Sequence, residues 1–330
     1  MIVKNEEKNI ARCLECLAPL MDEMIIVDTG STDRTKEIAR HYTERIYDFS
    51  WCDDFAKARN AAVQKATMDY IYIADADELL DETNIHRFWQ MKQVLLPEID
   101  IVQMKYTNQL EFGTTYNYDV EYRPKLYKRL RPVEFIDPIH ETVRIDPIIY
   151  DSEIEIIHKP HESHKERDFA MIQTIIKRGD VISKKLHNMY AKELYIAGEE
   201  KDFVKAFDFF QKTFSDPTRG MDELTDAICI VTHVYRLKKD IANFFKYCLK
   251  NIATQPCSEV CYELGEYYFE KQDMNEAIIW YYNGAFESES HLSIKYSKEL
   301  PLKRLIQCYE LLGDSDNAKQ YSEMLKQIEE

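Results

Sequence analysis

Glycine and long apolar runs are both scarce in this chain, and each shortage excludes a class of protein. Only 8 of its 330 residues are glycine, so it lacks the glycine-rich phosphate loop that a nucleotidyltransferase would usually need. It has no run of about 18 apolar residues, so no membrane span is predicted. Residues 1–6 lack the basic and apolar pattern of a signal peptide. We therefore expect a cytoplasmic protein.

Positive charge is also in short supply. The chain has 43 Lys and Arg against 59 Asp and Glu, which gives a formal net charge of −16. A phosphate backbone requires a basic face, so nucleic-acid binding is excluded. The eight cysteines are scattered, and the nearest pair, Cys13 and Cys16, has no second pair downstream to complete a zinc site. Buried, reduced thiols are the simpler expectation.

Up to about residue 165 the chain alternates strand-like and helix-like segments. Short apolar runs at 24–27 and 70–74 are typical of strands buried on both faces, and helical patterns follow at 34–42 and 55–66. Strands that alternate with helices at this spacing predict an α/β domain with a parallel sheet covered by helices. Ligands of such sheets bind at the carboxyl ends of the strands.

From about residue 166 to the end, the pattern is helical throughout, which predicts two domains, 1–165 and 166–330. Small and aromatic residues recur in this second part at spacings that let two antiparallel helices approach closely. The residues that carry the pattern are Leu264, Gly265, Tyr268, Ala277, Tyr281 and Ala285. This segment resembles a tetratricopeptide repeat. The alternative is a plain helical bundle with coincidental spacing.

Two acidic groups stand where predicted strands end. Asp75 and Asp77 follow the strand at 70–74, and Asp28 follows the strand at 24–27. Paired carboxylates repel each other unless a cation lies between them, and oxygen ligands suit magnesium or manganese. Arg59, on the intervening helix, supplies a cation for a diphosphate or a base carbonyl. Solvated loop acids are the alternative for an isolated Asp-X-Asp.

Four ordered motifs in residues 1–165 resemble the family 2 glycosyltransferases of the GT-A fold, in which a mixed sheet is flanked by helices. The motifs are MIVKNEE, IVDTGSTDRT, WCDDFAKARN and ADADE. With the repeats that follow, the chain is similar to bacterial protein or peptide S- or O-glycosyltransferases. The resemblance implies a nucleotide-diphosphate sugar donor, a UDP-sugar above all, and Mn²⁺ or Mg²⁺ as cofactor. It also implies transfer with inversion at the anomeric carbon.

The resemblance also implies roles for individual residues. Asp28 resembles the acid that binds the nucleotide base, with Arg59 as its basic partner. Asp75 resembles the residue on the ribose side, and Asp77 resembles the metal ligand. Val3 and Asn5 are expected to line the base pocket. The first strand is shorter here than in the family: either the given sequence begins inside it or the strand is short.

Inverting transfer needs a carboxylate to accept the proton of the acceptor, and residues 135–143 offer two. Glu141 is the first choice and Asp137 the second. His158 matches the late histidine that completes the metal site in many GT-A enzymes. Lys165 and Arg167, just beyond it, are placed to close over the diphosphate; the alternative is a solvated hinge between the domains.

Two function classes remain open on the sequence alone. One is an active glycosyltransferase whose repeats hold a protein, peptide or glycan acceptor, since helical repeats present a concave binding face. The other is a catalytically silent front domain attached to a binding scaffold. Self-association through the helical repeats is a further expectation. The sequence names neither the sugar nor the acceptor atom.

Overall fold

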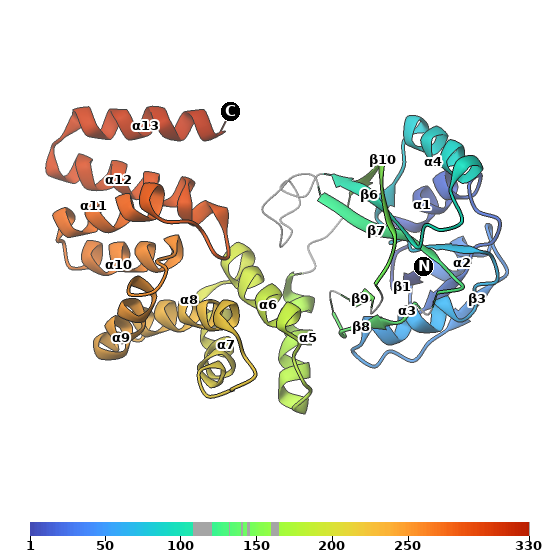
Figure 1. The fold of residues 1–330 in the computed structure, drawn as a ribbon, viewed down its shortest axis with the longest axis horizontal. Coiled ribbons are helices and arrows are strands. Elements are labelled where there is room, and N and C mark those ends of the chain that lie inside the picture. Colours follow the sequence, from blue (N-terminus) through green and yellow to red (C-terminus); the bar gives the residue numbers. More distant parts are fainter. Residues whose placement is uncertain (108–120, 132, 140, 144–145, 160–164, 330) are drawn as a thin grey trace. The chain divides into compact units, whose positions relative to one another are not determined.

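The computed structural model describes the whole chain except residues 108–120, 132, 140, 144–145, 160–164 and 330 (Figure 1). It divides into two compact units, Met1–Asp180 and Val181–Glu330. Helix α5 (Lys165–Arg178) therefore counts with the first unit, where Arg178 donates to the Cys52 carbonyl and pairs with Asp53. The boundary between 165 and 166 stays a prediction.

The first unit opens with a small parallel sheet. Its strands lie in the order β1 (Ile2–Val3), β2 (Ile26–Asp28) and β3 (Ile46–Asp48). The register pairs Val3 with Asp28 and Asp28 with Asp48, so the carboxyl ends of all three strands lie side by side. Helices α1 (Ile10–Leu17), α2 (Thr35–Ala39) and α3 (Phe55–Val63) connect or follow these strands.

A second, mixed sheet completes the unit. Its strands lie in the order β4 (Tyr70–Tyr72), β7 (Glu121–Lys128), β6 (Ile101–Thr107), β10 (Ile149–His158) and β5 (Glu78–Leu79). The pair β6–β10 is parallel and the other pairs are antiparallel. A short hairpin of β8 (Phe135–Ile136) and β9 (Thr142–Val143) stands apart. The mixed sheet with flanking helices is thus confirmed. The parallel sheet predicted from the alternation holds for β1, β2 and β3, whereas β4 belongs to the mixed sheet and pairs antiparallel with β7.

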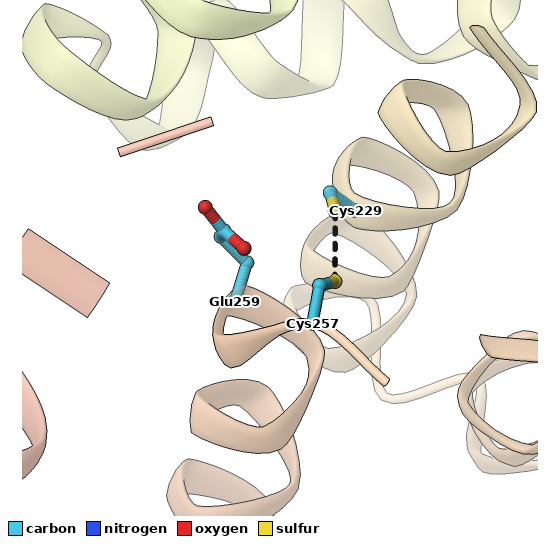
Figure 2. A group of neighbouring side chains, drawn as sticks. All are labelled: Cys229, Cys257 and Glu259. Atoms are coloured by element: carbon cyan, nitrogen blue, oxygen red, sulfur yellow. Dashed lines mark hydrogen bonds between the residues drawn. The ribbon is translucent and has the colours of Figure 1, made fainter. Parts of the chain in front are cut away.

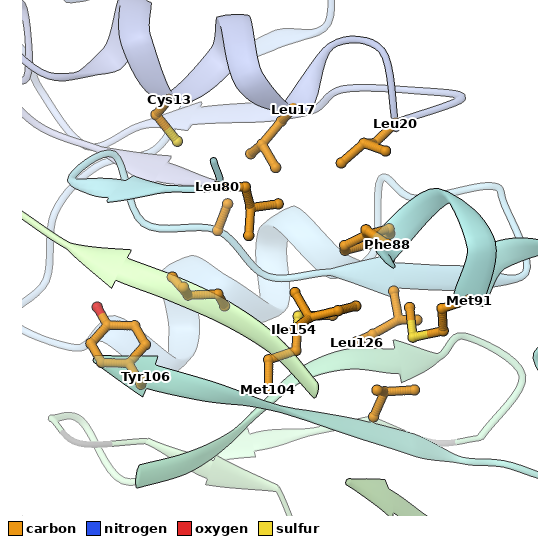
Figure 3. Close-up of a cluster of buried hydrophobic side chains, with 13 residues drawn as sticks. Cys13, Leu17, Leu20, Leu80, Phe88, Met91, Met104, Tyr106, Leu126 and Ile154 are labelled. Carbon is orange, nitrogen blue, oxygen red and sulfur yellow. The ribbon is translucent and has the colours of Figure 1, made fainter. Parts of the chain in front are cut away.

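The main core of this unit lies between the mixed sheet and helices α1 and α4 (Glu82–Val94). Figure 3 shows Cys13 and Leu17 of α1 and Phe88 of α4 directed at side chains of β6 and β10. Cys13 is a buried free thiol, as the composition predicted. The apolar stripe of α1 supplies the burial that fixes this helix on the sheet.

The second unit consists of helices. They are α6 (Lys184–Ala197), α7 (Glu200–Thr213), α8 (Met221–Leu237), α9 (Ile241–Ile252), α10 (Ser258–Glu270), α11 (Met274–Tyr282), α12 (Glu299–Leu312) and α13 (Ser315–Glu329). A longer connection between α11 and α12 contains the short segments η1 (Asn283–Glu287) and η2 (Ile294–Ser297). Successive helices pack on each other, most extensively α10 on α11 and α12 on α13. None of the described helices is long and apolar enough to cross a membrane.

The residues of the repeat pattern make the contact between α10 and α11. Ala277 and Tyr281 are fully buried. A methyl group at Gly265 would lie 2.4 Å from the ring of Tyr281, so only glycine allows this approach. Gly313 ends α12 with a φ of +76°, a conformation that glycine adopts without strain.

Candidate active site

Asp28 ends β2 with its side chain only 2% exposed. Its Oδ2 accepts hydrogen bonds from the backbone amides of Gly30 and Ser31, at 3.1 and 3.0 Å, and lies 3.9 Å from Nζ of Lys36. Its Oδ1 is buried and has no hydrogen-bond partner among the described residues. A buried acceptor without a donor is costly, so this oxygen is suited to a ligand N–H.

Asn5 joins the ends of β1 and β2. Its backbone is in the left-handed region, with a φ of 57°, which asparagine tolerates better than most residues. Its amide donates to Oγ of Ser31 at 2.9 Å, and its Oδ1 accepts from the amide of Thr32 at 2.8 Å. The carbonyl of the buried Val3 accepts from the amide of Thr29 at 2.9 Å. Val3 and Asn5 therefore hold the loop that carries Asp28.

Arg59, on α3, joins two acids that are far apart in sequence. Its Nη2 donates to Oδ1 of Asp75 at 3.0 Å, and its Nε donates to Oε1 of Glu141. Burial would raise the pKa of Asp75, but the charges of Arg59 and Lys125 outweigh it and hold that pKa well below its usual range. Asp75 is therefore a carboxylate at neutral pH.

Asn60, the next residue of α3, fixes the β8–β9 hairpin, which carries Glu141 between its strands. Nδ2 of Asn60 donates to the carbonyl of Phe135 at 2.9 Å, and the Phe135 amide donates to Oδ1 of Asn60 at 2.8 Å. Asp54 caps α3 by accepting from the amide of Lys57. One helix thus positions both the guanidinium and the segment that carries the proposed base.

Asp77 and His158 come together from β5 and β10. Oδ2 of Asp77 lies 3.2 Å from Nε2 of His158, and their side chains are 15% and 16% exposed. The antiparallel register pairs His158 with Glu78, and the Lys159 amide donates to the Asp77 carbonyl at 3.0 Å. A carboxylate and an imidazole that converge in this way fit Mn²⁺, which accepts both oxygen and nitrogen ligands.

The sequence did not predict the ion pair between Lys125 and Glu78, which lies beside the turn that carries Asp75 and Asp77. Nζ of Lys125 lies 2.7 and 2.8 Å from the two carboxylate oxygens of Glu78, and both side chains are almost fully buried. Glu78 also accepts from the amide of Asp75 at 3.1 Å. Burial raises the pKa of Glu78, with Asp75 adding to the effect and Lys125 opposing it. The pair closes the turn between the two candidate ligand-binding aspartates.

The remaining predicted residues are placed as follows. Asp137 has a φ of 70°, and its side chain makes no hydrogen bond within the described part of the chain. Lys165 and Arg167 lie in the first turns of α5, and their side chains fall outside the described residues. The contacts therefore group Asp75, Arg59 and Glu141, and place Lys36, rather than Arg59, beside Asp28.

Residues 1–144 match the family model described as glycosyl transferase family 2. Over 237 residues the chain is 23% identical to the glycosyltransferase SunS of the SPbeta prophage of Bacillus subtilis, an alignment that covers 68% of this chain and 54% of that protein. A stretch of 80 residues is 45% identical to a TPR repeat-containing protein of Synechococcus elongatus, covering 24% of this chain and 20% of that protein. The chain thus spans about half the length of one relative and less of the other.

Among solved structures, glucosyl-3-phosphoglycerate synthase from Mycobacterium tuberculosis aligns with 14% identity and a TM-score of 0.40. That alignment covers 55% of this chain and 79% of the synthase, which was solved with Mn²⁺, uridine diphosphate and glucosyl-3-phosphoglycerate.

Proposed function

We propose that the glycosyl transferase family 2 domain of this chain is an active enzyme. It would transfer a sugar, with inversion, from a nucleotide-diphosphate donor to a protein, peptide or glycan acceptor. One observation carries the proposal: within a single turn, Asp75 contacts Arg59 and Asp77 contacts His158. This arrangement gathers two carboxylates, an imidazole and a guanidinium at one sheet edge, a set suited to a metal-bound diphosphate.

The donor base would bind at Asp28. The unpartnered Oδ1 of Asp28 would accept the imide N–H of uracil, which supports a UDP-sugar as the donor. The loop held by Asn5 and Val3 would form the wall of this pocket. Asp75, held ionised by Arg59, would accept a hydrogen bond from a hydroxyl of the ribose.

Asp77 and His158 would hold the divalent cation, Mn²⁺ or Mg²⁺. When bound, the cation would offset the negative charge of the leaving diphosphate. The residues themselves would fix its position, because Asp77 directly precedes β5 and the register of β5 with β10 pairs the next residue, Glu78, with His158. Lys165 and Arg167 remain proposed diphosphate contacts.

Glu141 would act as general base. Arg59 holds its Oε1, and its Oε2 has no hydrogen-bond partner within the described part of the chain. This second oxygen would take the proton as the acceptor forms its bond to the anomeric carbon and the diphosphate leaves on the opposite face. Asp137 is the alternative base.

The helical unit would present the acceptor. Its packed helix pairs and the repeat spacing between α10 and α11 support a surface for a peptide or protein. The domain limits, 1–165 for catalysis and 166–330 for the repeats, belong to this proposal.

The test is a comparison of Glu141→Gln with Asp137→Asn in the full-length chain. With Mn²⁺ and labelled UDP-sugars, we expect the first variant to lose transfer and donor hydrolysis by about 100-fold or more while it still binds uridine diphosphate. Asp137→Asn should keep most of its activity. The reverse ranking would make Asp137 the base. If the wild-type chain binds no nucleotide sugar and turns none over, the domain is catalytically silent and the proposal fails.

A further inference from the structure

A second cluster of ligand-type side chains lies in the helical unit, wholly outside the candidate active site. Cys229, in the middle of α8, and Cys257, the N-cap residue of α10, have their sulfur atoms 3.5 Å apart. Figure 2 shows the two sulfurs facing each other, with Glu259 on the first turn of α10. One ligand atom from each of the three residues lies within 4.8 Å of the other two.

The spacing of the two sulfurs matches that of two thiolates on one metal ion. With Zn–S bonds of about 2.3 Å and tetrahedral angles, two sulfurs lie about 3.8 Å apart. The observed 3.5 Å is close to this value and far above the roughly 2.05 Å of a disulfide bond.

Glu259 brings a buried carboxylate to this cluster. The residue is 0% exposed. Its Oε1 accepts from the amides of Leu292 and Ser293, at 2.7 and 2.9 Å, and its Oε2 from that of His291 at 3.0 Å. These amides satisfy hydrogen bonds but bring no net charge. The imidazole of His291 lies 2.8 Å from Asp226. Burial lowers the pKa of His291, but the hydrogen bond and charge of Asp226, together with the charge of Glu259, outweigh it and raise that pKa. Glu259 therefore shares this positive charge with Asp226, although buried charges are usually paired or coordinate metals.

Neighbouring candidates are already engaged. Asp226, one turn before Cys229 on α8, accepts from His187 at 3.0 Å, Asn188 at 2.9 Å and His291 at 2.8 Å. The donors to Asp226 are side chains, two of them histidines, whereas the donors to Glu259 are all backbone amides. The set that remains is two thiols and one carboxylate, which suits a borderline-soft divalent ion such as zinc rather than magnesium or calcium.

We propose that Cys229, Cys257 and Glu259 bind a zinc ion, with the fourth position left for a water molecule. The ion would join α8 to the start of α10 and, through Glu259, to the loop of residues 291–293. The positive end of the α10 dipole favours negative charge at this helix start. This site is independent of the proposed transferase activity.

The test uses the full-length, fully reduced protein with Co²⁺ and Zn²⁺ as probes. We expect Co²⁺ to give a thiolate-to-cobalt charge-transfer absorption at one ion per chain, and Zn²⁺ to raise the melting temperature. Asp77 and His158 contain no sulfur, so a cation bound there gives no such absorption. Cys257→Ser keeps a good N-cap residue and should therefore fold, yet lower Co²⁺ affinity by about 100-fold or more. Cys229→Ala should do the same.

Two controls test the assignment. Cys16→Ser removes one thiol of the nearest cysteine pair of the first unit, and Cys308→Ser removes a lone buried thiol of α12; both should keep the absorption. No charge-transfer band in the reduced wild-type chain would overturn the site. So would a band that survives in both Cys257→Ser and Cys229→Ala, or one that is lost in Cys16→Ser.

Discussion

The helical unit and the first unit both bury charged side chains, but they satisfy them to different degrees. In the helical unit, Glu266 accepts from Tyr281 at 2.7 Å and twice from Arg304, at 2.6 and 2.7 Å. In the first unit, Oδ1 of Asp28 and Nη1 of Arg59 are buried without a partner among the described residues. Burial of charge alone therefore does not mark a binding site. An incomplete set of partners at a strand end does, because a ligand can supply what is missing.

The largest effect is expected at the proposed metal site of the first unit. Asp77→Asn should lower the rates of Mn²⁺-dependent donor hydrolysis and transfer by about 100-fold or more, because the carboxylate that faces His158 is removed. Turnover assays with labelled donor measure this loss. Asp69→Asn, at the exposed amino end of β4, is the matched control and should stay near wild type. Full activity of Asp77→Asn, or of the wild type in excess chelator, would refute the metal assignment.

In the helical unit the corresponding change should act on stability instead. Glu263 bonds His233 at 2.8 Å and Arg236 at 2.6 Å. Burial opposes ionisation, but these two partners outweigh it and lower the pKa of Glu263 to about 2. A depressed pKa gives stability that is present above the unfolded value of about 4.3 and is lost as the pH falls toward 2.

The loss over that pH range should reach about 3 kcal/mol in the wild type. Glu263→Gln should be less stable than the wild type at neutral pH, and its free energy of unfolding should fall less on acidification. Urea unfolding between pH 5 and about 2.5 measures the difference. Glu310→Gln, exposed on α12, should follow the wild-type curve. Equal pH slopes for wild type and Glu263→Gln would contradict the argument.

A smaller effect is expected from packing alone. Gly265→Ala places a methyl group against the Tyr281 ring and should cost about 2 kcal/mol of unfolding free energy. Gly284→Ala meets its nearest atom at 3.5 Å and should change stability by less than about 1 kcal/mol. Thermal unfolding of both variants gives the comparison. Similar melting temperatures would show that α10 and α11 can separate without loss.

The smallest expected effect concerns the nucleotide. Asp28→Ala should weaken uridine diphosphate about 10-fold, because one buried hydrogen bond of the base is lost. Asp48→Ala is the matched control, since Asp48 pairs with Asp28 in register but is 79% exposed. Calorimetric titration of both variants decides the matter. An unchanged affinity of Asp28→Ala for uridine diphosphate would mean that the uracil base binds elsewhere.

The strand ends and the helical pair could be predicted because their signals are local. The apolar run before Asp75 and Asp77 fixes a strand and the turn that ends it, and the spacing from Gly265 to Tyr281 fixes a close helix contact. Such patterns depend on period and turn chemistry within about 20 residues. The structure bears out these elements within a few residues of the expected bounds.

The Glu78–Lys125 pair could not be predicted because its signal is not local. Lys125 comes 47 residues after Glu78, and it reaches the turn only because β7 pairs with β4 in one particular register. A glutamate after Asp-Ala-Asp otherwise indicates a solvated turn. Arg59 illustrates the same limit of local signals. Its helix was predicted, but its pairing with Glu141 depends on where the β8–β9 hairpin packs against α3.

The hairpin's attachment to α3 imposes a constraint on how this chain can vary. The Phe55 amide donates to the carbonyl of Pro138 at 2.8 Å. Asn60, five residues after Phe55, donates to the carbonyl of Phe135. Inserting or deleting one residue between these two points would turn Arg59 and Asn60 about 100° around the helix axis, away from Glu141 and the hairpin together. The spacing from Phe55 to Asn60 should therefore be intolerant of length changes even where individual side chains, such as Lys57, are free to vary.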